Sequence, residues 1–134
     1  MSTFRAGLLD TSVFIAQEAG RELESERLPE EGFVSVITWG ELHAGVHVAA
    51  DTDTRARRLR TLERVGEVSL LTVGPEAAAH WGRLRARLAE AGRRASVNDL
   101  WIAAIALAND LPVVTQASDF DVLAELELVS VVRV

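Results

Sequence analysis

Residues 6–15 read AGLLDTSVFI, in which a short apolar run meets an acid and then a helical stretch. An apolar run this short predicts a buried strand, Gly7–Leu9, because a helix would need a longer window. The residues after it predict a first helix, Thr11–Gln17. Asp10 therefore falls at the junction between a strand and a helix.

Three further acids fall where an apolar segment meets a loop or a helix. Glu41 opens the helical run after an apolar segment, Asp99 opens a strongly apolar helix, and Asp119 follows a predicted strand. In a parallel α/β sheet, ligands bind in the crevice beyond the carboxyl ends of the strands. We therefore expect Asp10, Glu41, Asp99 and Asp119 to converge on one site.

Short apolar runs alternate with longer helical windows along the chain, which is typical of an α/β domain with a mainly parallel central sheet of about five strands flanked by helices. The predicted strands are Gly7–Leu9, Phe33–Ser35, Ser69–Thr72, Pro112–Thr115 and Leu128–Val132. The predicted helices are Thr11–Gln17, Val36–Ala50, Asp53–Val65, Pro75–Ala91 and Asn98–Asn109. We expect Thr52 or Asp53 to cap the third helix and Gly92 to end the fourth.

The composition limits the class of protein. A chain of 134 residues with 49% hydrophobic residues fits one domain, residues 1–134, with a real core. The net charge of −6 argues against binding of nucleic acid by overall charge. A polyanionic substrate would have to be bound by local arginines and metal instead. There is no cysteine, no signal-peptide pattern and no apolar run of about 20 residues, which favours a cytoplasmic protein with no membrane segment.

Each acid also has an ordinary structural explanation. Asp10 is placed to cap the first helix, Asp99 complements a helix dipole, and Asp119 suits a turn. Glu41 is harder to explain in this way, because its helical neighbours indicate a partly buried face where an unpaired carboxylate is costly. Clustered carboxylates repel one another, and Mg²⁺ or Mn²⁺ would relieve that repulsion with oxygen ligands suited to phosphate chemistry.

The histidines and arginines are weaker candidates. His43 and His47 stand four residues apart, but they lack the glutamate of a zinc-protease motif and face away from Glu41. Most arginines are interpreted as a solvated face. Arg93 and Arg94 are the exception, because they precede Asp99 in a predicted loop and are candidates for contact with the phosphate backbone of a substrate.

Four blocks of sequence identify a known family. They are LLDTSVFI at 8–15, SVITWGEL at 35–42 with Gly45 after it, NDLWIAA at 98–104, and LPVVT at 111–115 leading into Asp119 and Phe120. In order and spacing the chain resembles the PIN-domain ribonucleases, and most closely the VapC toxins of bacterial toxin–antitoxin pairs. The resemblance implies a PIN-like three-layer fold.

The resemblance also implies a site and partners. Asp10, Glu41, Asp99 and Asp119 would bind Mg²⁺, for which Mn²⁺ would substitute, with support from Thr11 or Ser12. Ala117 stands where relatives often carry Asn or Asp, which leaves Asp121 as the alternative fourth acid. The implied activity is hydrolysis of RNA, a tRNA or ribosomal segment, by a homodimeric toxin that a VapB-type antitoxin neutralises with a segment over the acidic groove.

Three other kinds of protein share part of this pattern. A phospho-accepting receiver domain gathers acids in the same way but needs a lysine, and all 14 basic residues of this chain are arginine. A non-catalytic binding module would have no reason to keep all four acids. A housekeeping RNA-processing nuclease of the same family would share the whole site, and only the neighbouring gene would distinguish it from a toxin.

Overall fold

The computed structural model describes residues 5–134 and has a parallel sheet between two groups of helices. The strands are β1 (Ala6–Leu9), β2 (Glu31–Ser35), β3 (Leu70–Leu71), β4 (Val113–Thr115) and β5 (Val131–Arg133). The helices are α1 (Thr11–Glu18), α2 (Val36–His47), α3 (Thr52–Val65), α4 (Pro75–Glu90), α5 (Val97–Ala108) and α6 (Asp121–Glu125), with a 3₁₀ turn, η1 (Ser25–Arg27).

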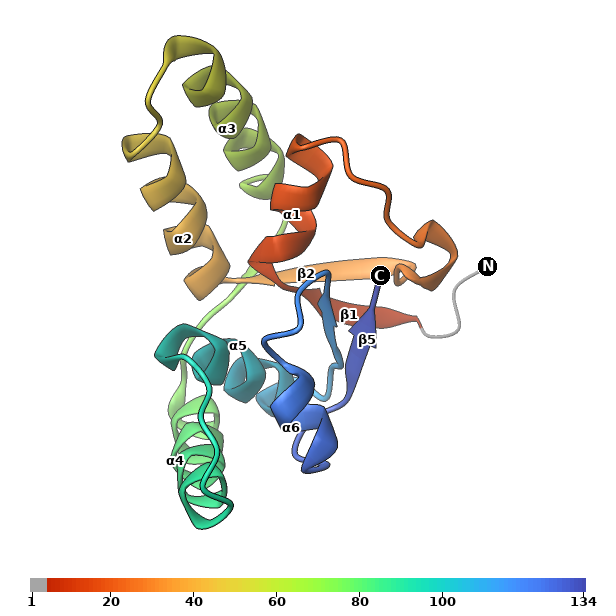
Figure 1. Cartoon of the computed structure of the whole chain (residues 1–134), viewed down its shortest axis with the longest axis vertical. Coiled ribbons are helices and arrows are strands. Elements are labelled where there is room, and N and C mark those ends of the chain that lie inside the picture. The colour runs from red at the N-terminus through yellow and green to blue at the C-terminus, as the bar shows by residue number, and fades with distance from the viewer. Residues whose placement is uncertain (1–4) are drawn as a thin grey trace.

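The sheet has the order β3-β2-β1-β4-β5, and every neighbouring pair is parallel. Helices α1, α2 and α3 lie on one side of it, and α4, α5 and α6 lie on the other (Figure 1). The predicted α/β fold with a five-stranded central sheet is confirmed. Because β1 lies between β2 and β4, the carboxyl ends of three strands meet at one edge, near the start of α1 and α2.

Helix α5 forms the centre of the larger core cluster, as its nearly uniform apolar sequence predicts. Its residues 102–106 are fully buried, and small alanines let α4 pack closely along it. Leu84, Phe120 and Leu123 are among the other buried members of this cluster. A smaller cluster around Val34 and Leu62 fills the space beneath α2 and α3. The helix that carries Asp99 is thus fixed by burial along most of its length.

The structure corrects several local predictions. Asp51, not Thr52 or Asp53, caps α3, and its side chain accepts from the Thr54 backbone N–H at 2.7 Å. Helix α6 and turn η1 were not predicted, because neither is long enough to show a helical period. The last strand begins at Val131 rather than Leu128, since the chain turns at Glu127, whose φ is 55°.

The remaining boundaries agree within a few residues, and Gly92, with a φ of 65°, follows the end of α4 as predicted. Helix α2 ends at His47, three residues before the predicted end at Ala50. Within residues 5–134, no helix combines the length and the apolar character needed to cross a membrane.

Candidate active site

Asp10 is held rigidly at the carboxyl end of β1. It is 5% exposed, and its side chain caps α1 by accepting from the Ser12 backbone N–H at 3.3 Å. Asp10 Oδ2 also accepts from Ser12 Oγ at 2.7 Å and from Thr115 Oγ1 at 3.0 Å. Thr115 reaches Asp10 because β4 is paired with β1. The capping role predicted for Asp10 is real, and it fixes the carboxylate at the sheet edge.

Glu41 is held by a second group of hydroxyls. It lies one turn into α2, which begins after Ser35, whose side chain accepts from the Thr38 backbone N–H at 3.2 Å. Glu41 Oε1 accepts from Thr11 Oγ1 at 2.7 Å. The Oγ1 atoms of Thr11 and Thr38 lie 3.0 Å apart. The half-buried carboxylate of Glu41 is therefore oriented by the first residue of α1.

Asp99 lies in the first turn of α5, where its backbone N–H donates to Ser96 Oγ at 3.1 Å. Burial raises the pKa of the Asp99 carboxyl to about 6, and the negative charges of Asp10, Asp119 and Glu41 add to this rise against an opposing hydrogen bond with Ser96. Three acids from other elements thus lie near enough to repel Asp99. The charges of the four predicted acids therefore act on one another.

Asp119 and its alternative, Asp121, have different surroundings. Asp119 is exposed in the loop between β4 and α6, where the predicted turn is present, and its charge acts on Asp99. Asp121 opens α6 and pairs with Arg133 Nη1 at 3.4 Å. It is not among the charges that raise the pKa of Asp99. Of the two acids, only Asp119 acts on the charge of Asp99, whereas Asp121 is paired with Arg133.

In this structure the four carboxylates are not close enough together to bind one metal ion. Within residues 5–134, no three His, Asp or Glu side chains are grouped closely enough to hold a metal ion. The carboxylates of Asp10 and Glu41 are turned onto hydroxyl groups instead. Their oxygen donors suit Mg²⁺ or Mn²⁺, and changes of side-chain rotamer would be needed to bring them together.

The two candidate RNA-contact arginines also differ. Arg93 Nη2 lies 2.9 Å from Glu125 Oε2, in an ion pair between the α4–α5 loop and α6. Arg94 is exposed and makes no hydrogen bond or ion pair with any other described residue. Arg94 is therefore the freer of the two to contact a phosphate.

The histidines do not converge on the acids. His43 and His47 are exposed, and the ring of His43 packs edge-on against Trp39 with centroids 4.7 Å apart. His80 Nδ1 lies 3.0 Å from Arg83 Nη2. The exposure of His43 and His47 agrees with their interpretation as polar surface residues.

Two threonines of the site were missed in the sequence. Thr38 and Thr115 are both fully buried, and each contacts a residue that the sequence did single out. Thr38 could have been found, because it lies three residues from both Ser35 and Glu41 and so shares their helix face. Thr115 could not, because its contact depends on the pairing of β1 with β4.

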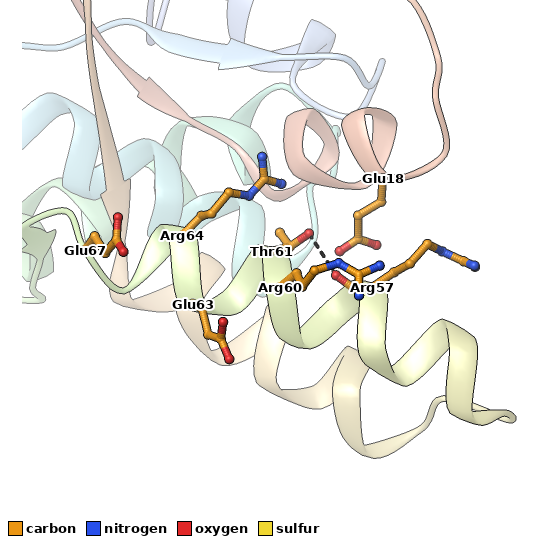
Figure 2. A pocket seen from close by; sticks show the side chains of 7 residues that line it. All are labelled: Glu18, Arg57, Arg60, Thr61, Glu63, Arg64 and Glu67. Atoms are coloured by element: carbon orange, nitrogen blue, oxygen red, sulfur yellow. Dashed lines mark hydrogen bonds between the residues drawn. The ribbon is translucent and has the colours of Figure 1, made fainter.

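Two grooves flank the α1–α3 side of the molecule. One, of about 200 Å³, runs from Thr11 and Glu41 past the exposed apolar side chains of Ile15 and Val48, and Arg58 of α3 also lines it. The other, of about 540 Å³, lies between α1 and α3 and contains none of the four acids (Figure 2). Its three arginines are balanced by three glutamates, so we assign no nucleic-acid site to it.

The comparisons with known proteins identify the family. The PIN-domain profile matches residues 7–126. Ribonuclease VapC5 of Mycobacterium tuberculosis is 50% identical over 133 residues, which are 99% of this chain and 98% of the relative. The chain belongs to the VapC ribonucleases of the PIN-domain family. The resemblance inferred from the four sequence blocks is confirmed.

Other VapC proteins support the same assignment. Ribonuclease VapC4 of M. tuberculosis is 35% identical over 127 residues, covering 95% of this PIN domain and 98% of the relative. The crystal structure of VapBC-5 of M. tuberculosis, a member of the VapBC family of toxin-antitoxin systems, contains a chain with 50% identity and a TM-score of 0.89, covering 96% of this chain and 98% of that one. The three-layer fold is thus that of VapC structures.

Proposed function

We propose that this VapC-type PIN domain is a divalent-metal-dependent endoribonuclease whose metal site consists of Asp10, Glu41, Asp99 and Asp119. The observation that carries the proposal is the position of four acids from separate elements at the carboxyl edge of the sheet. They lie close enough that Asp10, Asp119 and Glu41 add to the raised pKa of Asp99, which is due mainly to burial. Mg²⁺ is the expected ion and Mn²⁺ a substitute. The 50% identity to a ribonuclease supports RNA, from a tRNA or a ribosomal segment, as the substrate.

The residues of the site have separable roles in this proposal. A bound divalent ion would polarise the scissile phosphate and activate water as the nucleophile. Asp10, fixed by Ser12 and Thr115, provides the rigid oxygen donor. Glu41 is oriented by Thr11. Asp99, with a pKa of about 6, is ionised at neutral pH and available as a ligand. Asp119 completes the set from a loop.

The first prediction concerns pH and metal together. Because the folded-state pKa of Asp99, about 6, lies above its ordinary value of 3.8, ionisation of Asp99 opposes folding. In EDTA, the free energy of unfolding of the wild type should therefore fall relative to that of Asp99→Asn as pH rises from about 4 to about 6. Millimolar Mn²⁺ should raise the wild-type melting temperature more at pH 7 than at pH 5, because protons compete with the metal.

Urea unfolding from pH 4 to pH 6 measures the first effect, and differential scanning fluorimetry at pH 5 and pH 7 measures the second. Asp53→Asn, which alters an exposed acid in the first turn of α3, is the control and should behave as the wild type. A wild type that shows no Mn²⁺ shift at any pH, or a shift of equal size in Asp99→Asn, would argue against a metal site and for a non-catalytic binding module.

The second prediction concerns binding of the RNA backbone. We propose that Arg94 contacts a backbone phosphate, whereas Arg93 is held by Glu125. Arg94→Ala should raise KM about three- to tenfold with little change in kcat, and should reduce the slope of log KM against log salt concentration by about one. Steady-state cleavage at several salt concentrations measures both quantities. Arg93→Ala is the matched control, and equal effects of the two variants would contradict the assignment.

We further propose that the chain is a toxin that a VapB-type antitoxin restrains, as the toxin–antitoxin structures of its relatives suggest. We also propose that the toxin is a homodimer. The groove that begins at Glu41 offers apolar contacts at Ile15 and Val48, so an antitoxin segment placed there would cover the Glu41 carboxylate. An antitoxin gene is expected beside the gene for this chain. Its absence, together with normal growth on expression of the chain, would favour a housekeeping RNA-processing nuclease.

A further inference from the structure

Most of the buried polar side chains lie around Asp10 and Glu41. Six are buried among the described residues: Asp10, Thr11, Ser35, Thr38, Thr61 and Thr115. All except Thr61 lie at the carboxyl edge of the sheet, in contact with the acids or with one another. Burial of a hydroxyl group carries a cost unless it is hydrogen-bonded, so this concentration requires an explanation.

Thr38 is the member of this set whose role the proposed function leaves open. It is fully buried and does not contact any of the four acids directly. Its hydroxyl lies 3.0 Å from that of Thr11, and Thr11 Oγ1 lies 2.7 Å from Glu41 Oε1. Thr38 also lies one turn before Glu41 on α2, while Thr11 begins α1. The chain of contacts therefore ties the starts of two helices together at the level of the carboxylates.

The donor and acceptor roles in these contacts follow from the single hydroxyl proton of Thr11. Thr11 has one hydroxyl proton and two oxygen acceptors within reach, Glu41 Oε1 and Thr38 Oγ1. Thr11 Oγ1 is the donor in both contacts, and the bond to the carboxylate is the shorter and stronger of the two. Thr38 Oγ1 accepts from Thr11 on the other side, and these two acceptors together fix the rotamer from which Thr11 reaches Glu41.

We propose that Thr38 is a positioning residue for the metal site, acting through Thr11 to hold the Glu41 carboxylate at a fixed separation from Asp10. The inference rests on the proposed metal-dependent function. Packing does not account for a threonine here, because valine has nearly the same shape without the cost of a buried hydroxyl. Outer partners of metal ligands typically change metal affinity by about 10- to 100-fold when they are removed.

The test compares Mn²⁺ binding by isothermal titration calorimetry at pH 7.5 in three variants. Thr38→Val, which removes only the hydroxyl, should weaken binding about tenfold. Thr38→Ser, which keeps the hydroxyl, should stay within about twofold of the wild type. Thr61→Val is the matched control, because Thr61 is also buried and its hydroxyl donates to the backbone carbonyl of Arg57 within α3 (Figure 2), not to a residue of the proposed metal site. It should bind Mn²⁺ as the wild type does.

The outcomes separate this inference from the proposed function. A wild type that binds no Mn²⁺ specifically would overturn the metal site itself. Specific binding by the wild type with unchanged affinity in Thr38→Val, or equal losses in Thr38→Val and Thr38→Ser, would overturn the positioning role alone. If Thr38→Val does not fold, the Mn²⁺ affinities of Thr38→Ala and Thr38→Ser are compared, because these two variants differ only in the hydroxyl group. Equal affinities would overturn the positioning role of Thr38.

Discussion

Replacement of Asp99 by Asn is expected to reduce RNA cleavage by about a thousandfold or more while leaving the fold intact. The substitution removes the charge of a proposed metal ligand but keeps its shape and its position in α5. Asp99 is repelled by Asp10, Asp119 and Glu41, so the loss of its charge should not destabilise the protein in EDTA. Cleavage of a defined RNA under single-turnover conditions at saturating Mg²⁺ measures the effect, and thermal unfolding in EDTA checks the fold.

Asp119→Asn and Asp121→Asn extend this result to the fourth acid. Asp119→Asn should reduce cleavage strongly, whereas Asp121→Asn should have a small effect, because Asp121 is paired with Arg133. The reverse order would assign the fourth position to Asp121. Asp99→Asn enzyme that cleaves at the wild-type rate, in a preparation free of contaminating nuclease, would refute the role of Asp99.

Removal of divalent metal is expected to have an effect of the same size. EDTA should lower cleavage to the background rate, and added Mg²⁺ or Mn²⁺ should restore it. Metal-independent ribonucleases commonly use the ribose 2′-hydroxyl as nucleophile, with a general acid and base that are often histidines. Here His43 and His47 are exposed on α2, and His80 lies against Arg83 on α4, so no such pair converges.

A modified substrate provides the control for this second result. An RNA with a single 2′-deoxy sugar at the scissile position should still be cut, more slowly where contact with that hydroxyl is lost. A His43→Gln, His47→Gln double variant should cleave at nearly the wild-type rate. Full activity in EDTA, or complete resistance of the 2′-deoxy substrate, would require a different mechanism.

The positions of three acids could be predicted because the relevant signals are local. Asp10 and Asp99 each sit where the apolar pattern changes, and Glu41 follows a strand by one helical turn. These changes of pattern predict where each strand or helix begins and ends, and therefore at which end of the element the acid lies. The general rule for parallel sheets then places those ends together.

Other features of the site depend on contacts that no local pattern encodes. Thr115 donates to Asp10 across 105 positions of sequence, and this contact exists only because β4 pairs with β1. The engagement of Arg93 and Asp121 in ion pairs depends on α6 and β5. Helix α6 has five residues, too few for a detectable period, so neither ion pair was predictable.

The chemical identity of the RNA ends tests the central claim most directly. If water is the nucleophile at a metal site formed by the four acids, the 2′-hydroxyl is not consumed. Mass spectrometry of the products should then show a 5′-phosphate on one fragment and a 3′-hydroxyl on the other, and no new ends should form in EDTA. A 2′,3′-cyclic phosphate that persists in EDTA would contradict the account and direct attention back to the histidines.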